Sequence, residues 1–150
     1  MEKKSKKEAT KVAQNGATNN ALNSELIYAG TAVTCGNLVL LGKRIEFCPI
    51  LKIKPNFAGY WSVFCGGIET RETPLECAQR ELKEETGWDF PLNEFKHIGN
   101  IDNLALFNVE LKEMQNPKLC YEHTESGWFK KEHLLIQPSP SDSRIMRLLI

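Results

Sequence analysis

Short runs of apolar and β-branched residues follow residue 24 and are separated by glycine, asparagine and proline. The run from Ile27 to Leu41 breaks at Gly36-Asn37, a pair typical of a tight turn, so it predicts two strands joined as a hairpin. A further strand is expected from Ile45 to Ile53. Another is expected from Tyr60 to Phe64, where aromatic and β-branched residues precede a pair of glycines.

The next segment has the end signals of a helix. Thr73 is a favourable N-cap, Pro74 suits the first helical position, and Glu76 three residues after the cap completes a capping box. Gly87 supplies the residue type that commonly follows the last turn. These signals predict one helix from about Thr73 to Thr86.

Apolar periodicity continues beyond this helix. Two paired strands are predicted from His97 to Ile101 and from Leu104 to Leu111, and a short strand at Trp128-Phe129. An amphipathic helix is predicted from Asp142 to Ile150. Because strands come both before and after a central helix, the order of elements favours an α/β fold with a mixed sheet flanked by helices.

The first 24 residues differ from the rest of the chain. They contain five lysines and two glutamates, a side-chain charge of +3, and an Asn/Ala/Thr stretch with little to bury. This segment is predicted to be a solvated tail or a weak helix, and residues 25–150 a single domain. The basic tail leaves an RNA or polyphosphate partner as an alternative.

Composition narrows the class of protein. The chain has 150 residues, 41% of them hydrophobic, which suits one sizeable core, and 19 basic residues balance 19 acidic ones. We expect no membrane span and no secretory signal, and therefore a cytoplasmic protein. The widely spaced cysteines form no C-x-x-C pair and are predicted to be reduced: Cys35, Cys48, Cys65, Cys77 and Cys120.

Three carboxylates share one flank of the predicted helix. At about 100° per residue, Glu85 lies beside the apolar stripe, Glu81 next to it, and Glu84 further towards solvent. The stripe itself comprises Leu75, Ala78 and Leu82. Two unit charges about 4 Å apart repel by roughly 4 kcal/mol at an effective dielectric near 20, so a partly buried cluster favours a cation. Oxygen ligands select Mg²⁺, with Mn²⁺ as a substitute. The alternative interpretation of these glutamates is an ordinary solvated helix face.

The spacing of these residues decides between the two interpretations. Gly66 is followed after five residues by Glu72, and after seven more by the run from Arg80 to Trp88. This pattern resembles the signature of the Nudix hydrolase family at every fixed position. The resemblance covers about residues 27–150 and is strongest over residues 61–88.

The resemblance implies an α/β/α sandwich with a mixed sheet. It also implies a divalent-metal-dependent enzyme that cleaves the pyrophosphate linkage of a nucleoside diphosphate joined to another moiety. Glu81, Glu84 and Glu85 correspond to the acids that hold Mg²⁺ and supply the base, and which of them is the base stays open. Arg80 corresponds to the residue that pairs with Glu72.

Further site residues are predicted around this signature. The backbone carbonyl of Cys65 and the carboxylate of Glu122 would complete the metal site, Glu122 because an acid precedes a Trp-containing strand in the family. Gly66 and Gly67 would let the backbone approach a phosphate. The predicted substrate-binding side chains outside the loop are Arg44 and Tyr60.

The sequence departs from the family pattern in two places. Phe64 and Cys65 stand where members usually carry Pro and Gly, which predicts a less tightly turned loop. Arg71 replaces a frequent Gly before Glu72, which puts the local backbone conformation in question.

Other functions and partners are left open at this stage. The rivals are an RNA 5′-end pyrophosphohydrolase, favoured by the Lys-rich tail, and a binding module with the same fold but no turnover. A small-molecule nucleotide is the expected partner, no membrane partner is expected, and both a monomer and a homodimer fit the sequence. His97 and His133 are predicted to serve surface or packing roles, and His123 is the exception because it adjoins Glu122.

Overall fold

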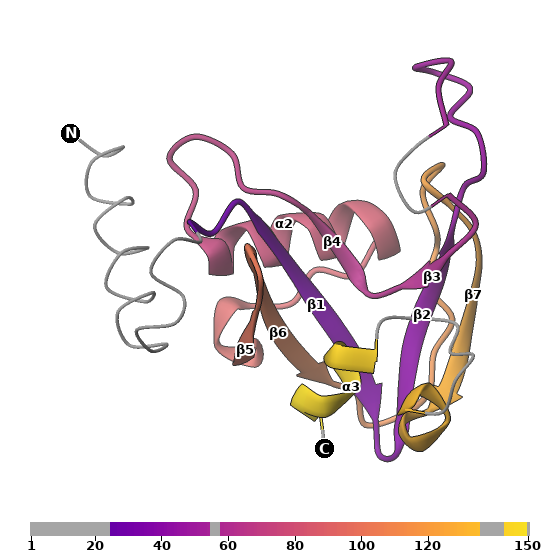
Figure 1. Ribbon diagram of the computed structural model, residues 1–150. Coiled ribbons are helices and arrows are strands. Elements are labelled where there is room, and N and C mark those ends of the chain that lie inside the picture. The colour runs from indigo at the N-terminus through magenta and orange to yellow at the C-terminus, as the bar shows by residue number, and fades with distance from the viewer. Residues whose placement is uncertain (1–24, 55–57, 136–142, 150) are drawn as a thin grey trace.

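The predicted hairpin lies at the centre of one mixed sheet of seven strands (Figure 1). The computed structural model describes residues 25–54, 58–135 and 143–149. The strands are β1 (Tyr28–Cys35), β2 (Leu38–Arg44), β3 (Trp61–Ser62), β4 (Phe64–Gly67), β5 (Lys96–Ile101), β6 (Leu104–Glu110) and β7 (His123–Lys130). The tail predicted at residues 1–24 lies outside the described residues.

Strand β1 organises the sheet. It runs parallel to β6 and antiparallel to β2 and β4, while β5 pairs with β6, and β3 and β7 pair with β2, all antiparallel. The prediction of a mixed sheet is therefore confirmed. The parallel pairing of β1 with β6 brings together strands that are distant in the sequence, with Tyr28 opposite Leu104.

Helix α2 (Pro74–Thr86) begins and ends where the sequence predicts. Thr73 accepts a hydrogen bond from the backbone N–H of Glu76, and the Glu76 side chain accepts one from the backbone N–H of Thr73. Gly87 ends the helix in the left-handed conformation, with φ at 79°. Both ends of α2 are thus satisfied by local hydrogen bonds.

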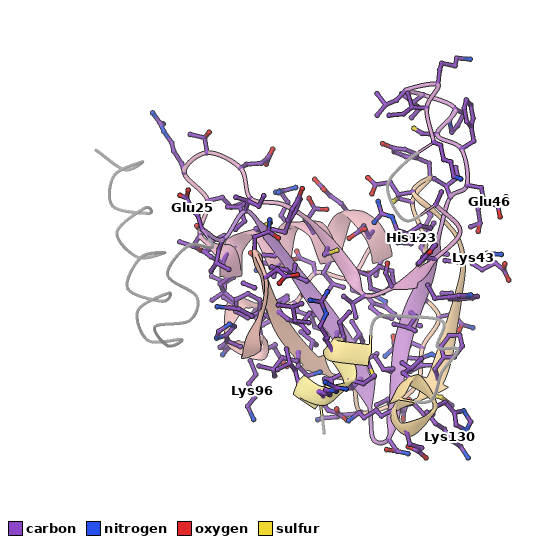
Figure 2. The ribbon with its side chains drawn as sticks, viewed as in Figure 1. Glu25, Lys43, Glu46, Lys96, His123 and Lys130 are labelled. Atoms are coloured by element: carbon purple, nitrogen blue, oxygen red, sulfur yellow. The ribbon has the colours of Figure 1, made fainter. Side chains whose placement is uncertain are left out.

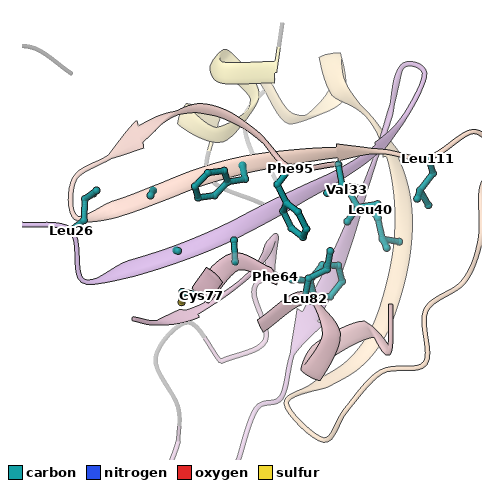
Figure 3. Close-up of a cluster of buried hydrophobic side chains, with 13 residues drawn as sticks. Leu26, Val33, Leu40, Phe64, Cys77, Leu82, Phe95 and Leu111 are labelled. Carbon is teal, nitrogen blue, oxygen red and sulfur yellow. The ribbon is translucent and has the colours of Figure 1, made fainter. Parts of the chain in front are cut away.

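The sheet separates two hydrophobic clusters, which makes the fold three-layered. Figure 3 shows the cluster on the side of the sheet that carries α2. Alternate residues of β6 belong to different clusters: Ala105 and Phe107 lie on the α2 face, and Leu106 on the other. Helix α3 (Ser143–Leu149) and the 3₁₀ helix η3 (Lys131–Leu135) cover that second face. A shorter 3₁₀ helix, η2 (Leu92–Glu94), follows α2. The α/β/α prediction is confirmed.

One predicted strand is wrong. Residues 45–53 do not extend β2 but form a turn that projects from the sheet, closed by an isolated bridge between Cys48 and Ile53 (Figure 1). Pro49 has no backbone N–H to donate to a neighbouring strand, and Lys52 adopts a φ of 58°. Apolar content without regular alternation misled the sequence interpretation here.

Two other predictions were correct in place but not in extent. The segment from Tyr60 to Phe64 is divided between β3 and β4, and the short strand at Trp128-Phe129 is the end of the longer β7.

The five cysteines are free, as predicted. No helix in the part of the chain that the structure describes is long and apolar enough to cross a membrane.

Candidate active site

Helix α2 places its acidic side chains at very different depths. Glu85 is only 1% exposed and Glu81 9%, whereas the side chain of Glu84 is 55% exposed. Ala78 and Leu82 are fully buried against the sheet, which fixes the rotation of the helix. The predicted order of the acids around α2 follows from this rotation.

Arg80 joins the acids to the loop that precedes α2. Its guanidinium donates to the Glu72 carboxylate over 2.7 and 2.9 Å, to Glu81 over 2.9 Å and to Glu84 over 3.2 Å. It also donates to the backbone carbonyl of Gly67 over 3.0 Å. The predicted pairing of Arg80 with Glu72 is therefore present, within a larger network.

This network affects ionisation. Burial acts to raise the pKa of Glu72, but the hydrogen bonds from Arg80 and from the Glu69 backbone outweigh it, so the pKa lies below its usual value. The pKa of Arg80 is raised, chiefly by its hydrogen bonds to Glu72. Both groups are held in their charged forms, and the pair is a fixed element of the site.

The glycine loop lies directly on the acids. A Cβ atom on Gly66 would come within 2.2 Å of the Glu81 carboxyl group, so only glycine leaves room for that carboxyl group there. The neighbouring Gly67 is exposed, and nothing lies within 4 Å of the position of its Cβ. The loop thus combines close packing on one side with open space on the other.

The two departures from the family pattern have structural solutions. Arg71 adopts a φ of 71°, so an arginine occupies the left-handed conformation that glycine would favour. Cys65 lies in β4 opposite Gly30, where a Cβ on the glycine would come within 2.4 Å of the Cys65 Cβ. Phe64 is fully buried in the core. Gly30 in β1 thus leaves room for the Cys65 side chain in β4.

Strands β2 and β7 form the opposite wall of the site. Their register is regular from Leu38 to Lys43, but Arg44 pairs with His123 instead of Thr124 because of a bulge. The bulge places His123 on the same face of the sheet as Gly42, the face that packs against α2. The His123 ring packs edge-on against Phe64, with centroids 5.3 Å apart.

Packed in this way, the His123 side chain lies near the acids, beside the C-terminal end of α2 (Figure 2). It is only 4% exposed, and its Nδ1 lies 3.8 Å from Oε1 of Glu85. Burial, followed by the charge of Arg44, lowers the pKa of His123 to about 4, so the ring is neutral near pH 7. The sequence placed His123 beside Glu122, but its contact with Glu85 depends on a bulge that the sequence does not signal.

Glu85 is the most perturbed acid of the site. Burial and the charges of Glu81 and Glu122 raise its pKa to about 9, against the opposing charge of Arg44. Burial raises the pKa of Glu81 as well. The charges of Glu122 and Arg44 therefore act on the acids of α2 in the folded chain.

The two remaining predicted residues have different surroundings. Burial raises the pKa of the Cys65 thiol to about 12, with Glu85 as the next cause, so this thiol is protonated near pH 7. Tyr60 is 61% exposed, and its backbone carbonyl accepts a hydrogen bond from the Arg44 N–H over 2.8 Å. Tyr60 lies at the base of the projecting turn, beside Arg44.

The donor groups present fit a hard cation. Both oxygens of Glu85 are buried and make no hydrogen bond with a described residue. Within the described ranges, no three acidic, thiol or imidazole groups are grouped closely enough to enclose an ion. Carboxylate oxygens with unused lone pairs in a shared negative field are nevertheless the donors that Mg²⁺ and Mn²⁺ prefer.

Comparison with known proteins supplies the family. The sequence pattern of the NUDIX domain matches residues 28–148, which is most of the chain. The chain belongs to the Nudix family. The match includes the sheet, α2, β7 and α3, and therefore both walls of the candidate site.

Two curated relatives match this chain over only part of their own length. A putative hydrolase, 111R, of Invertebrate iridescent virus 3 is 29% identical over 111 residues, 69% of this chain and 58% of the viral protein. An octanoyltransferase of Myxococcus xanthus is 42% identical over 43 residues, 29% of this chain and 12% of that protein. The Nudix chain thus spans little more than half, or far less, of these relatives.

Solved structures share the fold at low identity. A MutT protein of Methanosarcina mazei has a TM-score of 0.64 at 21% identity and covers 82% of this chain and 88% of its own. The NUDIX domain of Shewanella oneidensis NrtR, complexed with ADP ribose, has a TM-score of 0.62 at 16% identity, covering 88% and 90%. A C. elegans Ap4A hydrolase has a TM-score of 0.58 at 16% identity, covering 81% and 92%.

Proposed function

We propose that this Nudix chain is a divalent-metal-dependent hydrolase that cleaves the pyrophosphate linkage of a nucleoside diphosphate joined to another moiety. The observation that carries the proposal is the environment of Glu85. A carboxyl group that is 1% exposed, close to other acids and without hydrogen bonds to described residues weakens the fold unless a cation or a proton is bound. Such a perturbed acid is typical of a functional site.

The chain's own groups would divide the work of the reaction. Glu81 and Glu85 would chiefly hold Mg²⁺, with Glu84, Glu122 and the Cys65 carbonyl completing the set. The bound cation would neutralise charge on the phosphoryl oxygens and lower the pKa of a water ligand. The general base is one of the same acids.

Other groups would keep this arrangement in place. Arg80 restrains Glu72, Glu81 and the Gly67 carbonyl through one guanidinium, which couples the loop to α2. Gly66 leaves space for the Glu81 carboxyl group. Both residues act on the geometry of the acids.

Substrate contacts are proposed at the rim of the site. Gly66 and Gly67 would face the phosphates through their backbone, since Gly67 borders open space. Arg44 would bind a phosphoryl oxygen, because its buried Nε makes no hydrogen bond with a described residue. Tyr60, exposed beside Arg44, would contact the nucleoside. Relatives that bind ADP ribose or hydrolyse Ap4A support a small nucleotide as the substrate.

A substrate panel tests the proposed activity. Nucleoside triphosphates, nucleotide sugars and dinucleotides are incubated with the purified chain and MgCl₂ or EDTA, and released phosphate, pyrophosphate and nucleoside monophosphate are measured. We expect Mg²⁺-dependent cleavage of at least one compound. Binding without cleavage of any compound would support the rival, a Nudix binding module.

RNA 5′ ends are the second candidate substrate, and the five lysines within residues 1–24 favour them. If the tail binds RNA through phosphate contacts, affinity falls steeply with salt, and removal of residues 1–24 reduces that slope. A salt titration of RNA binding with both chains separates this candidate from a small-nucleotide enzyme.

The free cysteines suit a reducing compartment such as the cytoplasm.

A further inference from the structure

Four buried polar atoms belong to two side chains that lie close together between β7 and α2. They are the two carboxylate oxygens of Glu85 and the two ring nitrogens of His123, and none of them makes a hydrogen bond with a described residue. The two side chains are 0% and 1% exposed, and Nδ1 of His123 lies 3.8 Å from Oε1 of Glu85. Buried polar groups without partners are rare in folded proteins, so a group of four indicates a functional arrangement.

The backbone around His123 is arranged to admit its ring. A Cβ on Gly42 would come within 2.7 Å of the His123 ring and 2.9 Å of the Phe64 ring, so glycine at this position creates the slot. The bulge that pairs Arg44 with His123 turns the imidazole into that slot. Three independent features, a glycine, an aromatic contact and a bulge, therefore hold one ring beside one carboxylate.

We infer that His123 is a positioning residue for Glu85, donating a hydrogen bond from Nδ1 to Oε1 when the carboxylate carries its charge. The inference rests on the proposed function, because it gives His123 a role towards the acid assigned to the metal. The separation of 3.8 Å exceeds a charge-assisted hydrogen bond by about 1 Å, so the two side chains would approach each other by that amount. The second oxygen of Glu85 then stays free to bind the cation.

Such a hydrogen bond would orient the acid without adding charge. A neutral imidazole donates one hydrogen bond and leaves the net charge of the site unchanged, whereas an arginine in its place would compete with the cation. Hydrogen bonds to metal-binding carboxylates fix their orientation, and their loss costs about 10–100-fold in metal affinity or activity. His123 thus takes towards Glu85 the role that Arg80 takes towards Glu81.

Three substitutions test this role. His123→Asn places an amide nitrogen close to the position of Nδ1, His123→Gln places it close to Nε2, and His123→Leu removes both. We expect Leu and Gln to lower kcat by about 10–100-fold with little change in KM, and Asn to stay within about threefold of the parent chain. The rise in Tm on adding MgCl₂ should shrink in Leu and Gln and be retained in Asn.

Stability distinguishes positioning from packing. Leucine has no polar atom to bury between Gly42 and Phe64, so His123→Leu should be at least as stable without metal as His123→Asn. The inference therefore requires opposite orders: Asn above Leu in kcat, and Leu at or above Asn in stability. Activity that follows stability across the three variants, or a Leu variant with unchanged kcat and Mg²⁺ response, overturns it.

The experiment also separates this inference from the proposed function. If the parent chain cleaves a substrate and Glu85→Gln does not, the proposed function stands and the His123 variants test the hydrogen bond alone. If the parent cleaves nothing on the panel, the proposed function fails, and the Mg²⁺-induced change in Tm of Asn against Leu still decides the role of His123. If the Leu variant does not fold, Asn and Gln supply the same comparison of Nδ1 with Nε2.

Discussion

At the scale of single residues, Glu85 combines burial with negative neighbours, and its surroundings oppose its charge. Its pKa is raised to about 9 by burial and by the charges of Glu81 and Glu122. The metal-free site therefore favours a proton on Glu85, and a bound cation would compete with that proton.

Glu85→Gln should lower kcat by at least about 100-fold, because it removes a charge that would hold the metal. Stability without metal should hold or rise, since glutamine is neutral in the buried site without binding a proton or a cation, and the rise in Tm with MgCl₂ should shrink. Lys83→Gln is the matched control on the same helix. Lys83 is exposed and paired only with Asp89 over 3.4 Å among the described residues, so its loss should be nearly silent.

Steady-state kinetics and thermal unfolding with and without Mg²⁺ check this pair. A Glu85→Gln chain that keeps the turnover and Mg²⁺ response of the parent on a cleaved substrate would mean that the metal site lies elsewhere. Damage from both substitutions would indicate a general disturbance of α2.

Without metal, stability should fall as pH rises from 6.5 to about 9. In this range folded Glu85 keeps a proton that the unfolded chain, with a pKa near 4.5, has lost, so rising pH favours unfolding. Below 6.5 His123 opposes this trend, because unfolded His123 binds a proton that the folded ring, with a pKa of about 4, does not. Glu85 contributes at most about 1.4 kcal/mol per pH unit to the slope above pH 6.5, which corresponds to one proton.

Urea unfolding in EDTA across this pH range measures the slope. The Glu85→Gln chain should show a flatter profile than the parent between pH 6.5 and 9. Parallel profiles for the two chains would show that Glu85 is ionised in the metal-free fold.

At the scale of elements, α2 connects the core to the chemistry. Ala78 and Leu82 fix its rotation against the sheet, and the capping box at Thr73 fixes its start. The glycine loop enters the helix through this cap, which satisfies backbone N–H groups of the first turn.

Thr73→Ala should lower the free energy of unfolding by about 1 kcal/mol, because it leaves the Glu76 N–H without its side-chain acceptor. The folded enzyme should keep a kcat close to that of the parent, since Thr73 touches none of the proposed ligands. Thr70→Ala, in the exposed part of the same loop, is the control and should change stability by less than about 0.5 kcal/mol. Urea denaturation measures both, and an equal effect of the two substitutions would contradict the capping role.

The helix and the bulge differ in how far the sequence could predict them. The ends of α2 depend on contacts between residues three or four apart, so Thr73, Glu76 and Gly87 sufficed to place them. The turn at residues 45–53 and the bulge beside Arg44 depend on the pairing of distant strands. The apolar content of residues 45–53 gave no sign of the turn. The alternation of residues along the strands gave no sign of the bulge.

At the scale of the whole molecule, the described residues form a three-layered sandwich whose two clusters of buried side chains lie on opposite faces of one sheet. The site lies where α2 meets β4, β2 and β7. Residues 1–24 are outside the described part of the chain, and their composition offers little to bury.

Deletion of residues 1–22 should therefore leave the fold and small-nucleotide hydrolysis nearly unchanged. Circular dichroism, the Tm and kcat of the shortened chain check this. Loss of the fold or a large drop in Tm would mean that the tail docks on the domain.

The sequence by itself determined the family, the mixed α/β architecture, α2 and the set of acids on it. Those features depend on the order of elements, on helical periodicity and on fixed spacing within 23 residues, all of which can be read along the chain. Only the tertiary structure decided how deeply each acid is buried, that Gly30 and Gly66 make room for Cys65 and Glu81, and that His123 lies beside Glu85. The physical reason is that burial and electrostatic field depend on segments that meet across the sheet, with Arg44 on β2 and His123 on β7 lying 79 positions apart in sequence but paired in register.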